Sequence, residues 1–186
     1  MVEVFDRLYP LTVPFRGPAG ISPYGWFMTI TTAYLIRDIQ PGDAEVWARL
    51  YSGYRSFYEL SVDDASVATT WGWMLGRQHG LRGIVAVAPG GEVVALANLR
   101  LFARPSVGKI GLYLDDLCTL PSSRASGAAG ALLARAAEIA AGEGANIVRW
   151  ITASDNAKAR SVYDALATAT PWVTYDMKPS DAPSMM

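Results

Sequence analysis

A turn made of small residues joins a strand-like segment to a helix-like segment in the second half of this 186-residue chain. The turn spans residues 124–130, RASGAAG, and follows the largely apolar stretch 112–120. A helix that begins without bulky side chains leaves several backbone N–H groups uncovered, and such groups attract phosphates. The turn has neither the Lys-Ser/Thr of a P-loop nor the three spaced glycines of a dinucleotide-binding loop. It therefore predicts an α/β fold with a phosphate-binding turn of another kind.

Composition and charge exclude several classes of protein. Hydrophobic residues make up 51% of the chain and charged residues 18%, values typical of a globular protein of one domain. Sixteen basic and 17 acidic residues leave no charge pattern for binding nucleic acid or a membrane surface. One cysteine and one histidine exclude an internal disulfide and a zinc cluster, so no metal is expected. Carboxylates, tyrosine and backbone groups must do the chemistry, in a protein expected to be cytoplasmic.

Hydrophobic periodicity and turn residues predict alternating strands and helices in the main part of the chain. The proline-rich residues 1–27 are interpreted as an extension, 28–179 as one folded domain and 180–186 as a tail. Strands are expected at about 34–40, 84–88, 93–102, 110–120, 147–152 and 172–177, and helices at about 41–57, 63–78, 126–141 and 156–167. Periodicity alone supports an α/β domain with a mixed sheet.

Three segments carry a more specific resemblance. The turn fits the pattern R/Q-x-x-G-x-G/A, residues 156–163 fit N-x-x-A-x-x-x-Y, and 113–121 read as the strand before the turn. In this order they resemble the GCN5-related N-acetyltransferase (GNAT) superfamily over about sixty residues. The resemblance implies the order β-α-α-β-β-β-α-β-α-β, with a mixed, mostly antiparallel central sheet flanked by helices.

The same resemblance implies acetyl-CoA as the cofactor. Backbone N–H groups of the turn would face its pyrophosphate, and backbone groups after the aspartate pair would bond the pantetheine arm and polarise the thioester carbonyl. For Asn156 the alternative is helix capping, for Arg124 a solvated surface position, and for Cys118 a small core residue. The cofactor-binding residues implied are Leu117, Cys118, Thr119, Arg124, Ala125, Ser126, Gly127, Ala128, Ala129, Gly130, Asn156, Arg160 and Tyr163.

Two adjacent carboxylates interrupt the strand before the turn. Asp115 and Asp116 indicate a β-bulge that re-aims side chains. One of them is the candidate base for the acceptor amine. The alternatives are an anchor for a cationic substrate and, for Asp116, a structural role as a cap or in a pair with Arg100 or Arg104. Tyr163 is the candidate acid that protonates the departing thiolate, and its alternative is a core aromatic position.

Aromatic residues crowd the first two predicted helices, which form the acceptor wall in the superfamily. Tyr54, Tyr58 and Glu59 are the candidate substrate-binding residues, since aromatic rings and a carboxylate hold an alkylammonium group. Core packing is the alternative for the rings. The superfamily usually places a Gly-aromatic pair shortly after the tyrosine. Here Leu166 and Ala167 stand there, so the acceptor side is defined less well than the cofactor side.

These features predict transfer of an acetyl group from acetyl-CoA to a primary amine, directly in a ternary complex. A small-molecule acceptor is favoured by the near-neutral charge of the chain and by the aromatic, apolar character of the predicted acceptor wall. The alternatives are acetylation of lysine in a protein or peptide, and a non-catalytic module that binds acyl-CoA. Neither nucleic acid nor a membrane is an expected partner, and pairing into a homodimer through edge strands is a further expectation.

Overall fold

A computed structural model describes residues 34–61 and 63–179. The predicted extension 1–27 and tail 180–186 lie outside these residues. The described chain forms two compact units, which meet in sequence between Ile151 and Thr152. The boundaries 28–179 for a single domain stay a prediction.

The first unit is built on a five-stranded sheet in the order β1-β2-β3-β4-β5. Neighbouring strands are antiparallel from β1 to β4, and β5 lies parallel to β4. This mixed, mostly antiparallel sheet confirms the predicted fold class. The strands are β1 (Leu35–Asp38), β2 (Leu81–Val87), β3 (Val93–Arg104), β4 (Lys109–Thr119) and β5 (Val148–Arg149).

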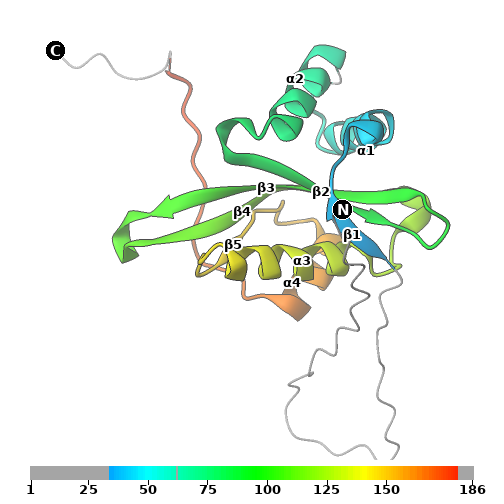
Figure 1. Ribbon diagram of the computed structural model, residues 1–186. Coiled ribbons are helices and arrows are strands. Elements are labelled where there is room, and N and C mark those ends of the chain that lie inside the picture. The colour runs from blue at the N-terminus through cyan, green and yellow to red at the C-terminus, as the bar shows by residue number, and fades with distance from the viewer. Residues whose placement is uncertain (1–33, 62, 180–186) are drawn as a thin grey trace, which may run out of the picture. The chain divides into compact units, whose positions relative to one another are not determined.

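Helices cover both faces of this sheet (Figure 1). Figure 1 shows α1 (Ala44–Phe57) and α2 (Asp64–Leu75) over one face and α3 (Ala128–Gly142) over the other. The fourth helix, α4 (Ala157–Leu166), belongs to the second unit. None of the helices in the described part of the chain is long and apolar enough to cross a membrane. Single-turn 3-10 helices lie at Pro41–Asp43 (η1), Gln78–Gly80 (η2), Pro105–Val107 (η3) and Pro121–Ser123 (η4).

The two faces of the sheet are packed differently. Under α1 and α2, the fully buried Trp47 stacks on Tyr51 with ring centroids 4.7 Å apart, and both pack against Leu96 of β3. Helix α3 buries mainly small residues, among them Ala131 and Ala136. Alanines at the contact let a helix approach a sheet closely. Position and direction of the turn before α3 are thereby fixed by the core.

Two strand predictions differ from the structure. The strand expected at 147–152 is formed only over Val148–Arg149. The strand expected at 172–177 is wrong, because these residues form no strand. Trp172 and Tyr175 are 80% and 88% exposed, so neither alternating face of this segment is buried. Alternation specifies a strand only where a neighbouring strand and a core are present.

A buried ion pair ties β1 to the start of α1. Arg37 donates from Nη1 and Nη2 to the two carboxylate oxygens of Asp43 at 2.6 and 2.8 Å, and Asp43 is only 6% exposed. The hydrogen bond from Arg37 lowers the pKa of Asp43. A carboxyl with a lowered pKa stabilises the fold above its unfolded pKa, near 3.9, and loses that effect as the pH falls through the folded value.

Asp43→Ala is therefore expected to destabilise the protein by about 2–3 kcal/mol at pH 7, since Arg37 would lose its partner. This corresponds to a fall in Tm of about 5–10 °C, and the difference from wild type should shrink below pH 4. Asp38→Ala is the control, because Asp38 is more exposed than Asp43 and pairs with Arg77 and, at 3.6 Å, with Arg82. Its loss should cost less than about 1 kcal/mol. Equal Tm values for the two variants would contradict the assignment.

Candidate active site

The predicted phosphate-binding turn lies between η4 and α3. Ala125 and Gly127 have φ angles of +60° and +90°, so the backbone turns sharply before the helix begins at Ala128. This geometry explains why the helix starts two residues later than predicted. No hydrogen bond of the described residues occupies the N–H groups of Ala128, Ala129 and Gly130. Nothing lies within 4 Å of a Cβ built on Gly127, so the turn is open to a ligand.

One edge of β4 leads from the sheet toward this turn. β5 pairs with β4 only at Leu112 and Tyr113. Beyond Tyr113, no strand of the described chain lies on that edge of β4, whereas the other edge stays paired with β3 as far as Thr119. At Leu117, Cys118 and Thr119, one edge of β4 is therefore paired with β3 and the other edge is not paired with a strand of the described chain. An extended ligand can bond such an edge as an added strand would.

The predicted bulge is present at the aspartate pair. Asp116 lies opposite Asn98 of β3, and Leu114 lies opposite Leu99, so Asp115 is the extra residue. A bulge lets two successive side chains project toward one face instead of alternating. This explains how Asp115 and Asp116 both contact polar side chains that β3 carries on the α1 side.

Asp116 is held beneath α1 by two hydrogen-bond donors. Asn98 donates from Nδ2 to Asp116 Oδ2 at 2.9 Å, and the Tyr54 hydroxyl also bonds this carboxylate. Burial raises the pKa of Asp116, while Asn98 and Tyr54 act in the opposite direction. Burial, followed by the charge of Asp116, raises the pKa of Tyr54, so its hydroxyl stays protonated. Asp116 is a half-buried carboxylate without a direct basic partner among the described ion pairs.

Asn98 is a site residue that sequence reasoning missed. Its side chain is fully buried, and its Oδ1 has no hydrogen-bond partner in the described part of the chain. A buried amide oxygen without a partner is uncommon and costs stability. The sequence does contain a signal for it: one asparagine interrupts the apolar run 93–99, VVALANL. A strand that only fills the core does not need a polar residue there.

Asp115 has a different environment. Arg100 donates from Nε to both of its carboxylate oxygens at 3.0 Å. The Arg100 guanidinium also lies 4.8 Å from the ring centroid of Tyr113. Burial raises the pKa of Asp115, and the charge of Arg100 lowers it. The ion pair expected as an alternative for Asp116 is therefore not formed, because Arg100 pairs with Asp115 and Arg104 bonds Asn146.

The predicted substrate-binding residues lie at the end of α1. The rings of Tyr54 and Tyr58 are tilted against each other with centroids 4.9 Å apart, and Tyr54 reaches Asp116. Glu59 follows on an exposed turn with φ +54°. The structure brings Tyr54, Tyr58 and Asp116 together.

Cys118 lies on β4 next to α1 as a protonated thiol. Its Sγ donates to the carbonyl oxygen of Leu50 at 3.4 Å, and burial raises its pKa to about 11. A thiol with this pKa holds almost no thiolate at neutral pH, so Cys118 is not poised as a nucleophile.

The remaining predicted residues lie on α4, in the second unit. Asn156 is the N-cap of α4, and its Oδ1 accepts from Ala159 N at 3.3 Å. Arg160 donates to the carbonyl oxygen of Ser154 at 2.7 Å. Tyr163 is half-buried on the same helix. The capping alternative for Asn156 is therefore realised, and its Nδ2 bonds Thr152 Oγ1 at 3.4 Å.

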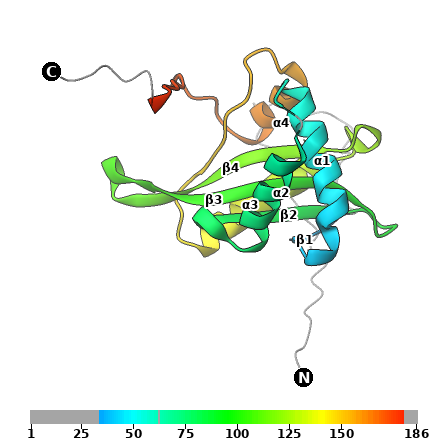
Figure 2. The same cartoon turned by 90° about the horizontal axis from the view of Figure 1, so that it is seen from above.

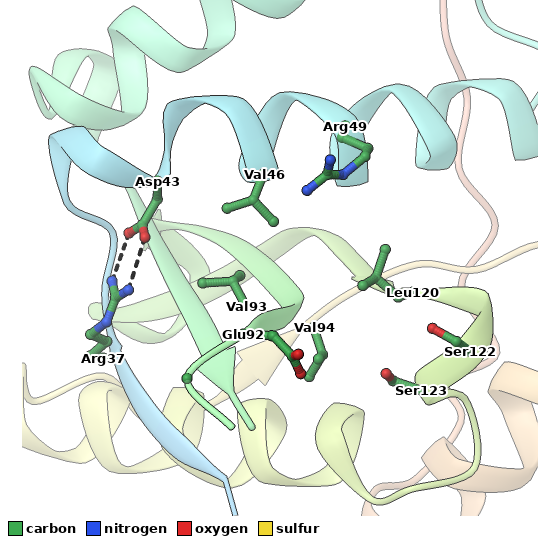
Figure 3. A pocket seen from close by; sticks show the side chains of 11 residues that line it. Arg37, Asp43, Val46, Arg49, Glu92, Val93, Val94, Leu120, Ser122 and Ser123 are labelled. Carbon is green, nitrogen blue, oxygen red and sulfur yellow. Dashed lines mark hydrogen bonds and ion pairs between the residues drawn. The ribbon is translucent and has the colours of Figure 1, made fainter. Parts of the chain in front are cut away.

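A cavity of about 570 Å³ lies apart from these residues, between α1, the β2–β3 turn and η4. Figure 3 shows Arg37 and Asp43 paired at one end, with Ser122 and Ser123 at the other. None of the predicted catalytic, substrate-binding or cofactor-binding residues lines it. It is a separate feature of the first unit.

Comparisons with known proteins agree with this geometry. A sequence model of the Acetyltransferase (GNAT) family matches residues 47–167. The chain belongs to this family. A GNAT relative, the uncharacterized N-acetyltransferase YhfO of Bacillus subtilis (strain 168), is 30% identical over 131 residues, covering 69% of this chain and 85% of YhfO.

Solved structures show the same GNAT fold. A probable acetyltransferase superposes with a TM-score of 0.69 at 22% identity, covering 80% of this chain and 99% of that one. The aminoglycoside N-acetyltransferase AAC(6')-Iy in complex with CoA gives a TM-score of 0.67 at 18% identity, covering 86% and 99%.

Membership in the GNAT family confirms acetyl-CoA as the predicted cofactor. The residues of this chain fit that group, because the turn before α3 offers uncovered N–H groups to a pyrophosphate. The unpaired edge of β4 offers backbone groups to the extended pantetheine arm of the cofactor. The role of each single residue stays a prediction.

Proposed function

We propose that this GNAT protein acetylates the primary amine of a small molecule, in a ternary complex with acetyl-CoA. The observation that carries the proposal is Asp116, a half-buried carboxylate held by Asn98 and Tyr54. It lies two residues before Cys118, on the part of β4 whose outer edge is unpaired. It lies where an acceptor amine would meet a thioester bound along that edge.

Residues 125–130 would bind the pyrophosphate through backbone N–H groups, with Arg124 adding a positive charge beside it. Leu117, Cys118 and Thr119 would bond the pantetheine arm, and an N–H group there would stabilise the oxyanion. Asn156, Arg160 and Tyr163 of α4 would complete the cofactor site. The cofactor supplies the acetyl group as a thioester, and this chain supplies position and proton transfer.

Acetyl transfer requires a neutral amine, and an alkylamine of pKa near 10 is only about 0.1% neutral at pH 7. Asp116 would attract the ammonium group and then take its proton, directly or through a water molecule. The amine nitrogen then bonds the acetyl carbon, the carbon–sulfur bond breaks, and Tyr163 gives a proton to the thiolate. Tyr54 and Tyr58 would contact the alkyl part of the ammonium ion.

Turnover assays with acetyl-CoA and a panel of polyamines, amino acids, aminoglycosides and lysine peptides test this proposal. Release of free CoA thiol with small amines supports it, and turnover confined to the peptides replaces it by protein acetylation. Binding of acetyl-CoA without turnover of any amine would identify a non-catalytic module.

Tyr163→Phe is expected to lower kcat by about 10- to 1000-fold with little change in the affinity for acetyl-CoA, as loss of a general acid does. Tyr175→Phe is the control, because Tyr175 is 88% exposed in the same unit. Steady-state kinetics and a calorimetric Kd measure the two effects. An unchanged kcat would assign Tyr163 to packing alone.

A further inference from the structure

A row of polar and aromatic side chains continues from Asp116 along β3 and β4. On β3, Asn98, Arg100 and Phe102 alternate in sequence and so project from the same face of the sheet. Tyr54 and Asn98 contact Asp116 at one end, and a series of contacts runs from Asp115 through Arg100, Tyr113 and Phe102 to Arg149 at the other. The two sets adjoin along β4, where Asp115 precedes Asp116. We call this row the polar strip: Asn98, Arg100, Phe102, Tyr113, Asp115, Asp116 and Arg149.

The far end of the polar strip is not covered by α1 or α2. Both views show the β3–β4 hairpin extending beyond these helices toward η3, and Figure 2 shows it from above. Arg100 keeps 38% of its side chain exposed and Asp115 keeps 26%. A ligand seated at Asp116 therefore has an accessible surface along which its other end can lie.

The two aromatic rings of the polar strip, Phe102 and Tyr113, lie against its arginine side chains. Phe102 and Tyr113 meet edge to face with centroids 5.9 Å apart, and the Phe102 ring lies directly over Gly111. A Cβ on Gly111 would come within 2.5 Å of that ring. The absence of a side chain there lets Phe102 lie flat, with the Arg149 guanidinium 5.5 Å from its centroid.

The charges of the strip do not all compensate one another. Arg100 and Asp115 form a close pair and are neutral together. This leaves the negative Asp116 at one end and the positive Arg149 at the other. Arg149 is half-buried, and no carboxylate of the described residues lies within ion-pair distance of it. A cation stacked on a ring without a counter-ion favours binding of an anion.

We propose that the acceptor is a zwitterion, with its ammonium group at Asp116 and an anionic group, a carboxylate or a phosphonate-like oxyanion, at Arg149. This inference rests on the proposed amine acetylation. Asn98 and Phe102 are four residues apart on β3, which is about 13 Å along the strand. Ion-pair contacts take about 3–4 Å at each end, so about 6 Å separate nitrogen and anionic group. A chain of about three to five carbons fits.

The test compares amines with and without the anionic group. Acetylation of 4-aminobutanoate and 5-aminopentanoate is measured against propylamine and butylamine, with 3-aminopropylphosphonate to separate the two kinds of anion. The wild-type kcat/KM should be at least about tenfold higher for a zwitterionic amine than for the matching amine without an anionic group. Arg149→Gln should raise KM for the zwitterionic amines by about 10- to 100-fold and leave KM for the simple alkylamines within about twofold.

Arg104→Gln is the matched control, because Arg104 lies at the end of β3 and bonds Asn146, which is outside the strip. Arg149→Lys should restore part of the lost affinity. Equal use of zwitterionic amines and simple alkylamines by the wild type overturns the inference and leaves the proposed function intact. An equal loss of activity with both kinds of amine in Arg149→Gln does the same. No turnover of any amine removes the proposed function, and this inference with it.

Discussion

Asp116→Asn is expected to lower the rate of amine acetylation by about 100- to 1000-fold, with an unchanged affinity for acetyl-CoA. Loss of a positioned base typically costs this much. An amide of the same shape can still accept from Asn98 and Tyr54, so the packing around the site is kept. Steady-state rates with an amine below saturation, together with a calorimetric Kd for acetyl-CoA, measure the two effects.

The stability of this variant should not fall. Burial raises the pKa of Asp116, so the folded protein holds this proton more tightly than the unfolded chain does. The stability that the protonated form gives is present at low pH and is lost as the pH rises through the folded pKa. Ionisation of Asp116 therefore costs stability in the folded protein, and Asp116→Asn should have an equal or higher Tm at pH 7, unlike a variant that disturbs the core.

The pH profile adds an independent test. In the wild type, the rate at subsaturating amine should rise with pH, because Asp116 must be ionised before it can take the proton of the ammonium group. Asp115→Asn is the comparison on the other side of the bulge. It removes an ion pair with Arg100 and should lower the rate less. If both variants kept wild-type rates from pH 6 to 9, the base would lie elsewhere, with Glu59 the next candidate.

Gly127→Val is expected to abolish binding of acetyl-CoA. Gly127 has φ +90°, which a β-branched residue tolerates poorly, and its side chain would cover the uncovered N–H groups of α3. In the wild type, ligand at a hundred times its Kd adds about 2.7 kcal/mol of stability, or about 5–10 °C in Tm. This increase should vanish in the variant.

A second glycine with a positive φ angle provides the control for backbone strain. Gly108 also has a positive φ, +59°, and lies at the β3–β4 turn away from the loop. Gly108→Val should therefore strain the backbone and lower the Tm of the ligand-free protein about as much as Gly127→Val does. It should still show the increase in Tm when acetyl-CoA is added. A Gly127→Val protein that still gained 5 °C or more would show that the pyrophosphate binds at another site.

The local sequence determined the helices and strands and the turn that is predicted to bind the cofactor. The small residues within 124–130 predicted a helix start with uncovered N–H groups. Periodicity located the strands β1 to β4 and the helices α1 to α4 of the described chain within a few residues. The adjacent aspartates were sufficient to predict the bulge, which the register confirms. These features depend on residues close together in the chain, so the sequence by itself contains them.

Tertiary structure alone decided what each polar side chain contacts. Pairing of β3 with β4 places Asn98 against Asp116 and Arg100 against Asp115, a difference set by one extra residue in the register. Alternation at 172–177 looked like a strand, yet no neighbouring strand buries it. Arg149 gains its ring partner only because β5 runs beside β4. Such contacts join residues far apart in sequence, and register and burial fix them where periodicity cannot.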